Sequence, residues 1–238
     1  MMNEHTAKAF DVDLQELTRK VAEMGGLAEK EVADAVAALA RRDLELARRV
    51  VATDASIDAL QREIEDKAVL TIARRQPMAV DLRQIVAALR VCNDLERIGD
   101  LAKNIAKRVS ALEANFHPQK LIRGVEHMAA LVMGQLKQVL DAYAAQDTAS
   151  ALAVWKGDEE VDALCTSLFR ELLTYMMEDP RNITFCIHLM FSAKNIERMG
   201  DHATNIAETV YYMVEGQPLS EQRPKGDTTA FAALPASG

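Results

Sequence analysis

Four pairs of acidic residues are spaced in this sequence so that each pair would lie on one face of an α-helix. Residues four apart in a helix lie one turn above one another, and like charges there repel by roughly a few tenths of a kcal/mol per pair. Four such pairs therefore need a compensating cation, and we predict that they bind metal ions. The predicted ligands are Asp54, Asp58, Glu96, Asp100, Asp158, Asp162, Glu197 and Asp201.

The types of these side chains indicate which metals would suit them. Carboxylate oxygens without cysteine favour hard cations, so we expect iron, manganese or magnesium, with zinc as a further candidate. His202 follows Asp201 directly, but it lies about 100° further around a helix. We therefore expect His202 beside the ligands or at the surface rather than on the metal. One acidic pair alone would indicate only a solvated helix face, and it is the duplication that favours a metal or ion cluster.

The acidic pairs belong to a sequence repeat. Residues 93–106 and 194–207 share Glu-Arg-x-Gly-Asp followed by Asn-Ile-Ala, and Glu96 and Glu197 are 101 residues apart (197 − 96). The acidic pairs that precede them are 104 residues apart (158 − 54), which predicts a longer loop before this segment in the first copy. A loop that changes length between matching helices is typical of a tandem repeat, so the sequence predicts two related halves.

A helical wheel indicates where the acidic residues point. Glu96 and Asp100 lie within roughly 80° of one another, and the apolar seam of the same segment lies on the opposite side. We therefore predict that they point outward or toward a neighbouring helix. Asp54 and Asp58 lie at the edge of an apolar stripe, so the two ladders of one half could converge. The glycine between Glu96 and Asp100, like its copy, costs about 1 kcal/mol relative to alanine, so we expect another helix or a ligand to approach the backbone there.

The spacing of apolar residues predicts an all-α protein made of two pseudo-symmetric three-helix bundles. Apolar positions alternate steps of three and four, as in helical bundles. We predict one bundle over residues 5–114, a second over 119–216 and a mobile tail over 217–238. Gly25-Gly26 is a candidate kink or break. The six predicted helices cover roughly 10–40, 43–75, 79–112, 119–145, 147–178 and 182–215.

Composition excludes several classes of protein. The net charge of −8 does not suit a nucleic-acid-binding surface. No apolar stretch approaches the roughly 20 residues of a membrane span, and the start of the chain does not resemble a signal peptide. The three cysteines lie in apolar helical patterns, so we expect buried free thiols in a reducing cytoplasm.

The duplicated phrase closely resembles the PhoU family, the accessory and regulatory proteins of the bacterial phosphate-specific transport system. The resemblance covers about residues 5–215, although the first copy has one extra residue before Glu96 and the tail departs from the family core. It implies two three-helix bundles whose Glu/Asp-xxx-Asp repeats bind metal clusters. Carried over by position, Glu96, Asp100, Glu197 and Asp201 match the motifs of the third helices, and the other four predicted ligands match those of the second.

The resemblance also implies a function. Proteins of this family are negative regulators of phosphate uptake and of phosphate-starvation signalling, and they link the ATP-binding subunit of the phosphate transporter to a sensor histidine kinase. Contact with the membrane would then be through those partners only. A closed two-fold dimer is the commonest homo-oligomer, so we expect a homodimer.

Two alternatives remain open from the residues, and one of them is a purely structural bundle that assembles through its acidic faces. A metal-dependent, carboxylate-bridged enzyme could also be built in a helical bundle, but the sequence has no Glu-x-x-His, which ferritin-like enzymes use. We therefore expect no enzymatic activity.

Overall fold

The computed structural model describes residues 2–112 and 119–220, and it contains no strand within those ranges. The prediction of an all-α tandem repeat is confirmed. The predicted boundary between the halves falls on residues 113–118, which lie outside the described residues, as does the predicted tail beyond residue 220. The elements are α1 (Met2–Arg41), α2 (Leu44–Arg75), α3 (Val80–Val109), α4 (Gln119–Ala145), α5 (Thr148–Lys156), α6 (Asp158–Glu178), the 3-10 helix η1 (Pro180–Asn182) and α7 (Ile183–Glu215).

The repeat extends to the way in which the helices begin. Asp43 caps α2 by accepting a hydrogen bond from Leu46 N at 2.9 Å, and Asp147 caps α5 by accepting from Ala149 N at 2.9 Å. These two caps are 104 residues apart (147 − 43), as are the acidic pairs that follow. An aspartate at this position satisfies an orphan backbone N–H and stabilises a helix by about 1 kcal/mol. Local sequence therefore fixes the same helix start in both halves.

The glycine that interrupts a helix is not the one that the sequence predicted. The helix predicted over 147–178 is wrong at one point, because Gly157 divides it into α5 and α6 and its carbonyl accepts a hydrogen bond from Gln135 at 2.9 Å. The candidate break at Gly25-Gly26 does not occur, and α1 is continuous. A Cβ at Gly25 would lie 2.7 Å from Leu140 Cδ1, so this glycine lets α1 and α4 approach closely.

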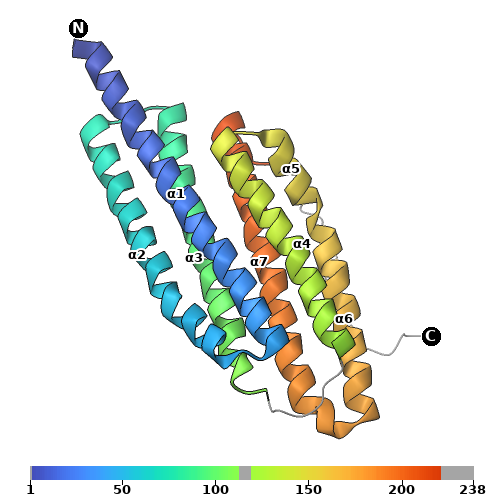
Figure 1. The fold of residues 1–238 in the computed structure, drawn as a ribbon. Helices are drawn as coiled ribbons and strands as arrows, with labels where there is room; N and C mark the ends of the chain where they lie inside the picture. The colour runs from blue at the N-terminus through green and yellow to red at the C-terminus, as the bar shows by residue number, and fades with distance from the viewer. Residues whose placement is uncertain (1, 113–118, 221–238) are drawn as a thin grey trace.

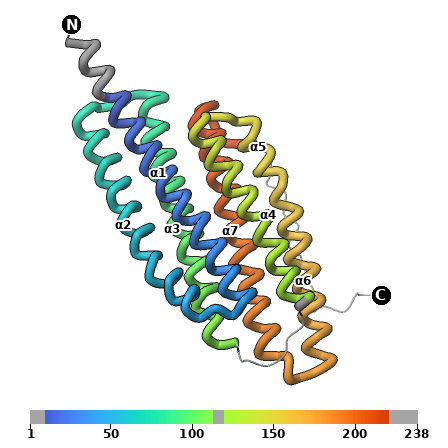
Figure 2. The backbone as a smooth tube through the Cα atoms, in the orientation of Figure 1, coloured from blue at the N-terminus to red at the C-terminus, as the bar shows by residue number. Residues whose placement is uncertain are grey.

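The two halves lie side by side and run in opposite directions (Figures 1 and 2). In Figure 1 α1 runs downward from the N-terminus, whereas α4 runs upward. The last helix of each half, α3 and α7, lies at the centre and packs against its counterpart, and α1 also contacts α4. The arrangement is therefore approximately two-fold symmetric.

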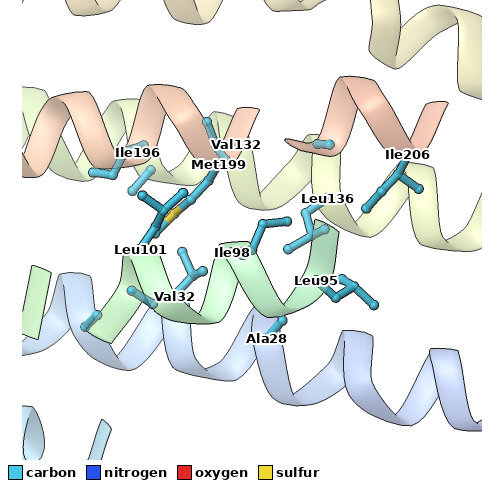
Figure 3. Close-up of a cluster of buried hydrophobic side chains, with 14 of the residues drawn as sticks. Ala28, Val32, Leu95, Ile98, Leu101, Val132, Leu136, Ile196, Met199 and Ile206 are labelled. Atoms are coloured by element: carbon cyan, nitrogen blue, oxygen red, sulfur yellow. The ribbon is translucent and has the colours of Figure 1, made fainter. Parts of the chain in front are cut away.

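One apolar core joins the halves (Figure 3). Ile98 of α3 and Met199 of α7 are fully buried, together with side chains from α1 and α4. At each end an arginine of α3 lies over an aromatic ring of α7: Arg90 Cζ is 5.0 Å from the centroid of Tyr212, and Arg108 Cζ is 4.4 Å from that of Phe191. The other labelled side chains of this core are Ala28, Val32, Leu95, Leu101, Val132, Leu136, Ile196 and Ile206.

Two further predictions can be compared with this fold. Cys92, Cys165 and Cys186 are buried cysteines outside any disulfide, as predicted. None of the helices in the described part of the chain is long and apolar enough to cross a membrane.

Candidate functional site

The acidic pairs of α2 and α3 converge on one ammonium group. Lys103 Nζ donates hydrogen bonds to Asp54 Oδ2 and to Asp100 Oδ1, both at 2.6 Å. Burial opposes the charge of this ammonium, but its bonds to Asp100 and Asp54 outweigh that effect and raise the pKa of Lys103. The predicted convergence of the two ladders is thus present in the first half.

Glu31 of α1 also belongs to this first cluster, and the sequence reasoning missed it. Its side chain is 2% exposed, and neither of its carboxylate oxygens has a hydrogen-bond partner. Burial, followed by the nearby charge of Asp54, raises the pKa of Glu31 to about 8. A Cβ at Gly99 would lie 3.3 Å from Glu31 Oε2 and 2.9 Å from Ile57 Cδ1, so the predicted close approach to this glycine is confirmed.

The remaining members of the first cluster lie nearer its rim. Burial raises the pKa of Glu96, although Arg97 Nε lies 3.4 Å from Glu96 Oε2 and favours the charged form. Arg97 also lies 3.7 Å from Asp100, which is partly exposed. The cluster therefore combines a buried interior at Glu31 with an accessible edge. Asp58 is partly buried, and its charge acts on both Glu31 and Glu96. We define the first cluster as Glu31, Asp54, Asp58, Glu96 and Asp100.

The second cluster is built in the same way from α4, α6 and α7. Asp158, Asp162 and Glu197 are at most 5% exposed, and Asp201 is half-buried. Glu197 Oε1 accepts a hydrogen bond from Lys194 Nζ at 2.8 Å, whereas its buried Oε2 has no hydrogen-bond partner. Burial raises the pKa of Glu197 against the opposing effect of Lys194. Gln135 of α4, with a buried unpartnered Oε1, completes the second cluster.

A signal for the missed residues was present in the repeat. Glu31 and Gln135 are 104 residues apart (135 − 31), the same offset as Asp54 and Asp158. Two residues separated by the same offset as two acidic pairs occupy matching positions in the two halves. The offset marks Glu31 and Gln135 as counterparts, whereas their place in the clusters depends on how the helices pack.

Of the two orientations predicted for the acidic pairs of α3 and α7, outward or toward a neighbouring helix, the second holds for the buried Glu197, which lies near Asp162 of α6. Asp54, Asp158, Asp162 and Glu197 are all buried. A wheel drawn for one helix locates only that helix's own seam, and in a bundle a second face is covered by the neighbouring helices. The glycine copy in the second half is not needed for close approach, because a Cβ at Gly200 would meet its nearest neighbours at an ordinary 3.6 Å.

The donor set can be tested against a metal ion without assuming one. Among the described residues, no three His, Cys, Asp or Glu side chains are placed so that they could hold a metal ion as they stand. The buried unpartnered oxygens of Glu31 and Glu197 nevertheless lie within sets of carboxylate and amide oxygens, the donors that hard cations prefer. The chemistry therefore fits such a cation, and the side chains would need to change rotamer to bind it.

The side chain of His202 contacts Asp94, which belongs to neither cluster. Its Nδ1 is 2.8 Å from Asp94 Oδ1, across the contact between α3 and α7. Asn205 Nδ2 donates to the same oxygen at 3.4 Å. The histidine thus pairs with a buried carboxylate between the halves, and we do not assign it to a metal.

Glu31→Gln should make the metal-free protein more stable at alkaline pH. The folded-state pKa of about 8 exceeds the ordinary 4.5, so the stability linked to the protonated Glu31 is present below pH 4.5 and is lost as the pH rises toward 8. An amide does not titrate. The variant should match the wild type near pH 4.5 and exceed it by about 4 kcal/mol at pH 8.

Urea denaturation in EDTA at several pH values measures this difference. The exposed Glu65 of α2 supplies the control, because Glu65→Gln makes the same substitution at the surface, where it should change the free energy of unfolding by at most about 0.5 kcal/mol. A constant difference between Glu31→Gln and the wild type across this range would show that Glu31 ionises normally.

Comparison with known proteins finds the same domain in both halves of the chain. The chain matches the PhoU domain twice, over residues 21–109 and over residues 125–210. A phosphate-specific transport system accessory protein PhoU homolog of Rhizobium meliloti is 57% identical over 230 residues, which is 97% of each chain. A homolog of the same name from Caulobacter vibrioides is 55% identical, over 95% of this chain and 98% of its own.

Solved structures agree with the described fold. The crystal structure of PhoU from Pseudomonas aeruginosa matches 87% of this chain and all of its own, with a TM-score of 0.81 and 40% identity. The phosphate transport system regulatory protein PhoU from Streptococcus pneumoniae matches 89% of this chain, with a TM-score of 0.83 and 28% identity.

Proposed function

This chain belongs to the PhoU family, and on that premise we propose that it is an accessory protein of phosphate transport that negatively regulates phosphate uptake and phosphate-starvation signalling. The observation that carries the proposal is the double match to the PhoU domain, with one copy in each half of the chain. Relatives more than half identical over nearly the whole length are named as accessory proteins of that system. Since accessory proteins act on other proteins, the proposed role requires no catalysis.

The proposed partners are the ATP-binding subunit of the phosphate transporter and a phosphate-sensing histidine kinase, and the proposed setting is the cytoplasm. Exposed apolar side chains suit such contacts. Ile183, Ile187 and Phe191 lie four residues apart along α7 and are 41%, 38% and 51% exposed. This stripe is one candidate contact surface, and a second copy of the chain, forming a homodimer, is a further proposed partner.

We further propose that both clusters bind hard metal ions, with iron, manganese or magnesium as the main candidates and zinc as another. Two features support this. The acidic pairs recur in register in both halves, and each cluster contains a buried carboxylate oxygen without a hydrogen-bond partner, on Glu31 in the first and on Glu197 in the second. A buried carboxylate without a partner is costly, and a bound cation would remove that cost.

A strain from which this chain has been deleted tests the regulatory role. We expect genes of the phosphate-starvation response to be expressed even in medium rich in phosphate, because the signal that holds them off is missing. A reporter for one such gene gives the measurement, and a plasmid that supplies the chain should restore repression. Normal repression in the deletion strain would refute the proposed role.

A further inference from the structure

The two clusters differ at the position where the first one holds its ammonium. Lys103 and Thr204 are 101 residues apart (204 − 103), the same offset as Glu96 and Glu197, so they occupy matching positions on α3 and α7. In the second cluster the Thr204 hydroxyl lies 3.2 Å from Asp158 Oδ1 and 3.1 Å from Gly200 O. In the first, the longer side chain places a positive charge among the carboxylates.

We propose that Lys103 is a built-in cation that occupies the first cluster and competes there with a divalent metal ion. The inference rests on the proposed metal binding and identifies Lys103 as the group that weakens this binding in the first cluster. The ammonium hydrogen-bonds one oxygen of Asp54, on α2, and one of Asp100, on α3, at 2.6 Å each. Its side chain is only 21% exposed, so it is held between these helices rather than in solvent.

A metal ion cannot share this position with the ammonium. A divalent cation needs carboxylate oxygens at roughly 2.0–2.5 Å, and at that distance from Asp54 and Asp100 it would lie within a few ångströms of Lys103 Nζ. Two positive charges so close repel strongly in a partly buried site. Lys103 must therefore swing outward before a metal ion enters, and the hydrogen bonds that it loses weaken binding.

Lys103 does not satisfy the whole cluster. Glu31 keeps two buried oxygens without hydrogen-bond partners, and the cluster holds five acidic side chains against Lys103 and the rim residue Arg97. The lysine is therefore a competitor for the site rather than a complete replacement for a metal ion. Glu31 marks the oxygens that a metal ion would gain once Lys103 has left.

The repeat supplies the variant that tests this inference. Lys103→Thr introduces the residue that α7 carries at the same position, where threonine is fully buried in the fold. Lys107→Thr is the matched control, because it removes the same charge from an exposed position one turn further along α3. Both are made in a background with Glu197→Gln and Asp201→Asn, so that binding reports the first cluster.

Titration with Mn²⁺ gives the first readout. Lys103→Thr should bind Mn²⁺ about tenfold more tightly than the background protein or more, and Lys107→Thr should bind as the background does. Adding Glu31→Gln to Lys103→Thr should cancel most of the gain. Equal affinity of the Lys103→Thr and Lys107→Thr proteins would overturn the inference. If the unmodified chain binds Mn²⁺, the proposed metal binding would still stand after such a result.

Thermal unfolding in EDTA gives a second readout that needs no bound metal. Without its ammonium the first cluster has unbalanced carboxylates, so Lys103→Thr should melt below Lys107→Thr in EDTA and recover when Mn²⁺ is added. Lys103→Gln, which keeps the length of the side chain, serves if the threonine variant does not fold. A melting temperature in EDTA equal to that of the control would show that Lys103 does not act as a counter-ion.

Discussion

Replacing Ile98 with aspartate is expected to lower the free energy of unfolding by about 4 kcal/mol or more, enough to unfold many domains of this size. Ile98 is fully buried where α3 packs against α7, in a cluster of apolar side chains from α1, α3, α4 and α7 (Figure 3). A carboxylate there would lose its hydration without gaining a hydrogen bond or a counter-ion. The substitution also removes an apolar side chain from the core that joins the halves.

Urea denaturation followed by two probes measures this effect. Far-ultraviolet circular dichroism reports both halves, whereas the only tryptophan, Trp155, lies on α5 and reports the second half. The wild type should show coincident transitions, because the halves share one core. Val69→Asp is the control, since Val69 is 63% exposed on α2 and the variant should stay within about 0.5 kcal/mol of the wild type. A similarly small effect at Ile98 would contradict the joined core.

The features that sequence predicted are those that each half encodes for itself. The acidic pairs and the offsets of 101 and 104 residues depend on local order along the chain, and they occur in both halves. An amphipathic seam is a property of a single helix. The all-α tandem repeat is therefore predictable from the order of the residues alone.

What sequence could not give depends on contacts between helices. Glu31 is one of several acidic residues on α1, and only its position near Asp54 and Gly99 makes it part of a cluster. Lys103 could equally have extended into solvent, because its residue type does not show that α2 would place Asp54 beside it. Gly157 divides a helix that the apolar pattern predicts as continuous. In each case tertiary packing decides an outcome that local pattern leaves open.

The second large effect is expected at Glu197 and Asp201. Changing them to Gln and Asn should abolish Mn²⁺ binding by the second cluster, because amides keep the shape but lose the charge that attracts a hard cation. Metal-free stability should stay within about 1 kcal/mol of the wild type. Burial raises the pKa of Glu197, so replacing this acid with an amide removes a destabilising buried charge at neutral pH. The loss of its ion pair with Lys194 lowers stability and so acts in the opposite direction.

This pair of outcomes separates a binding site from a structural one. If the acids of the second cluster mainly held α6 against α7, the double variant would lose stability in EDTA as well as Mn²⁺ binding. The control changes Glu65 and Asp66 of α2 to the same amides, because both are exposed and neither belongs to a cluster. It removes the same formal charge and should keep Mn²⁺ binding. Undiminished binding by the double variant would show that Glu197 and Asp201 do not hold the metal ion.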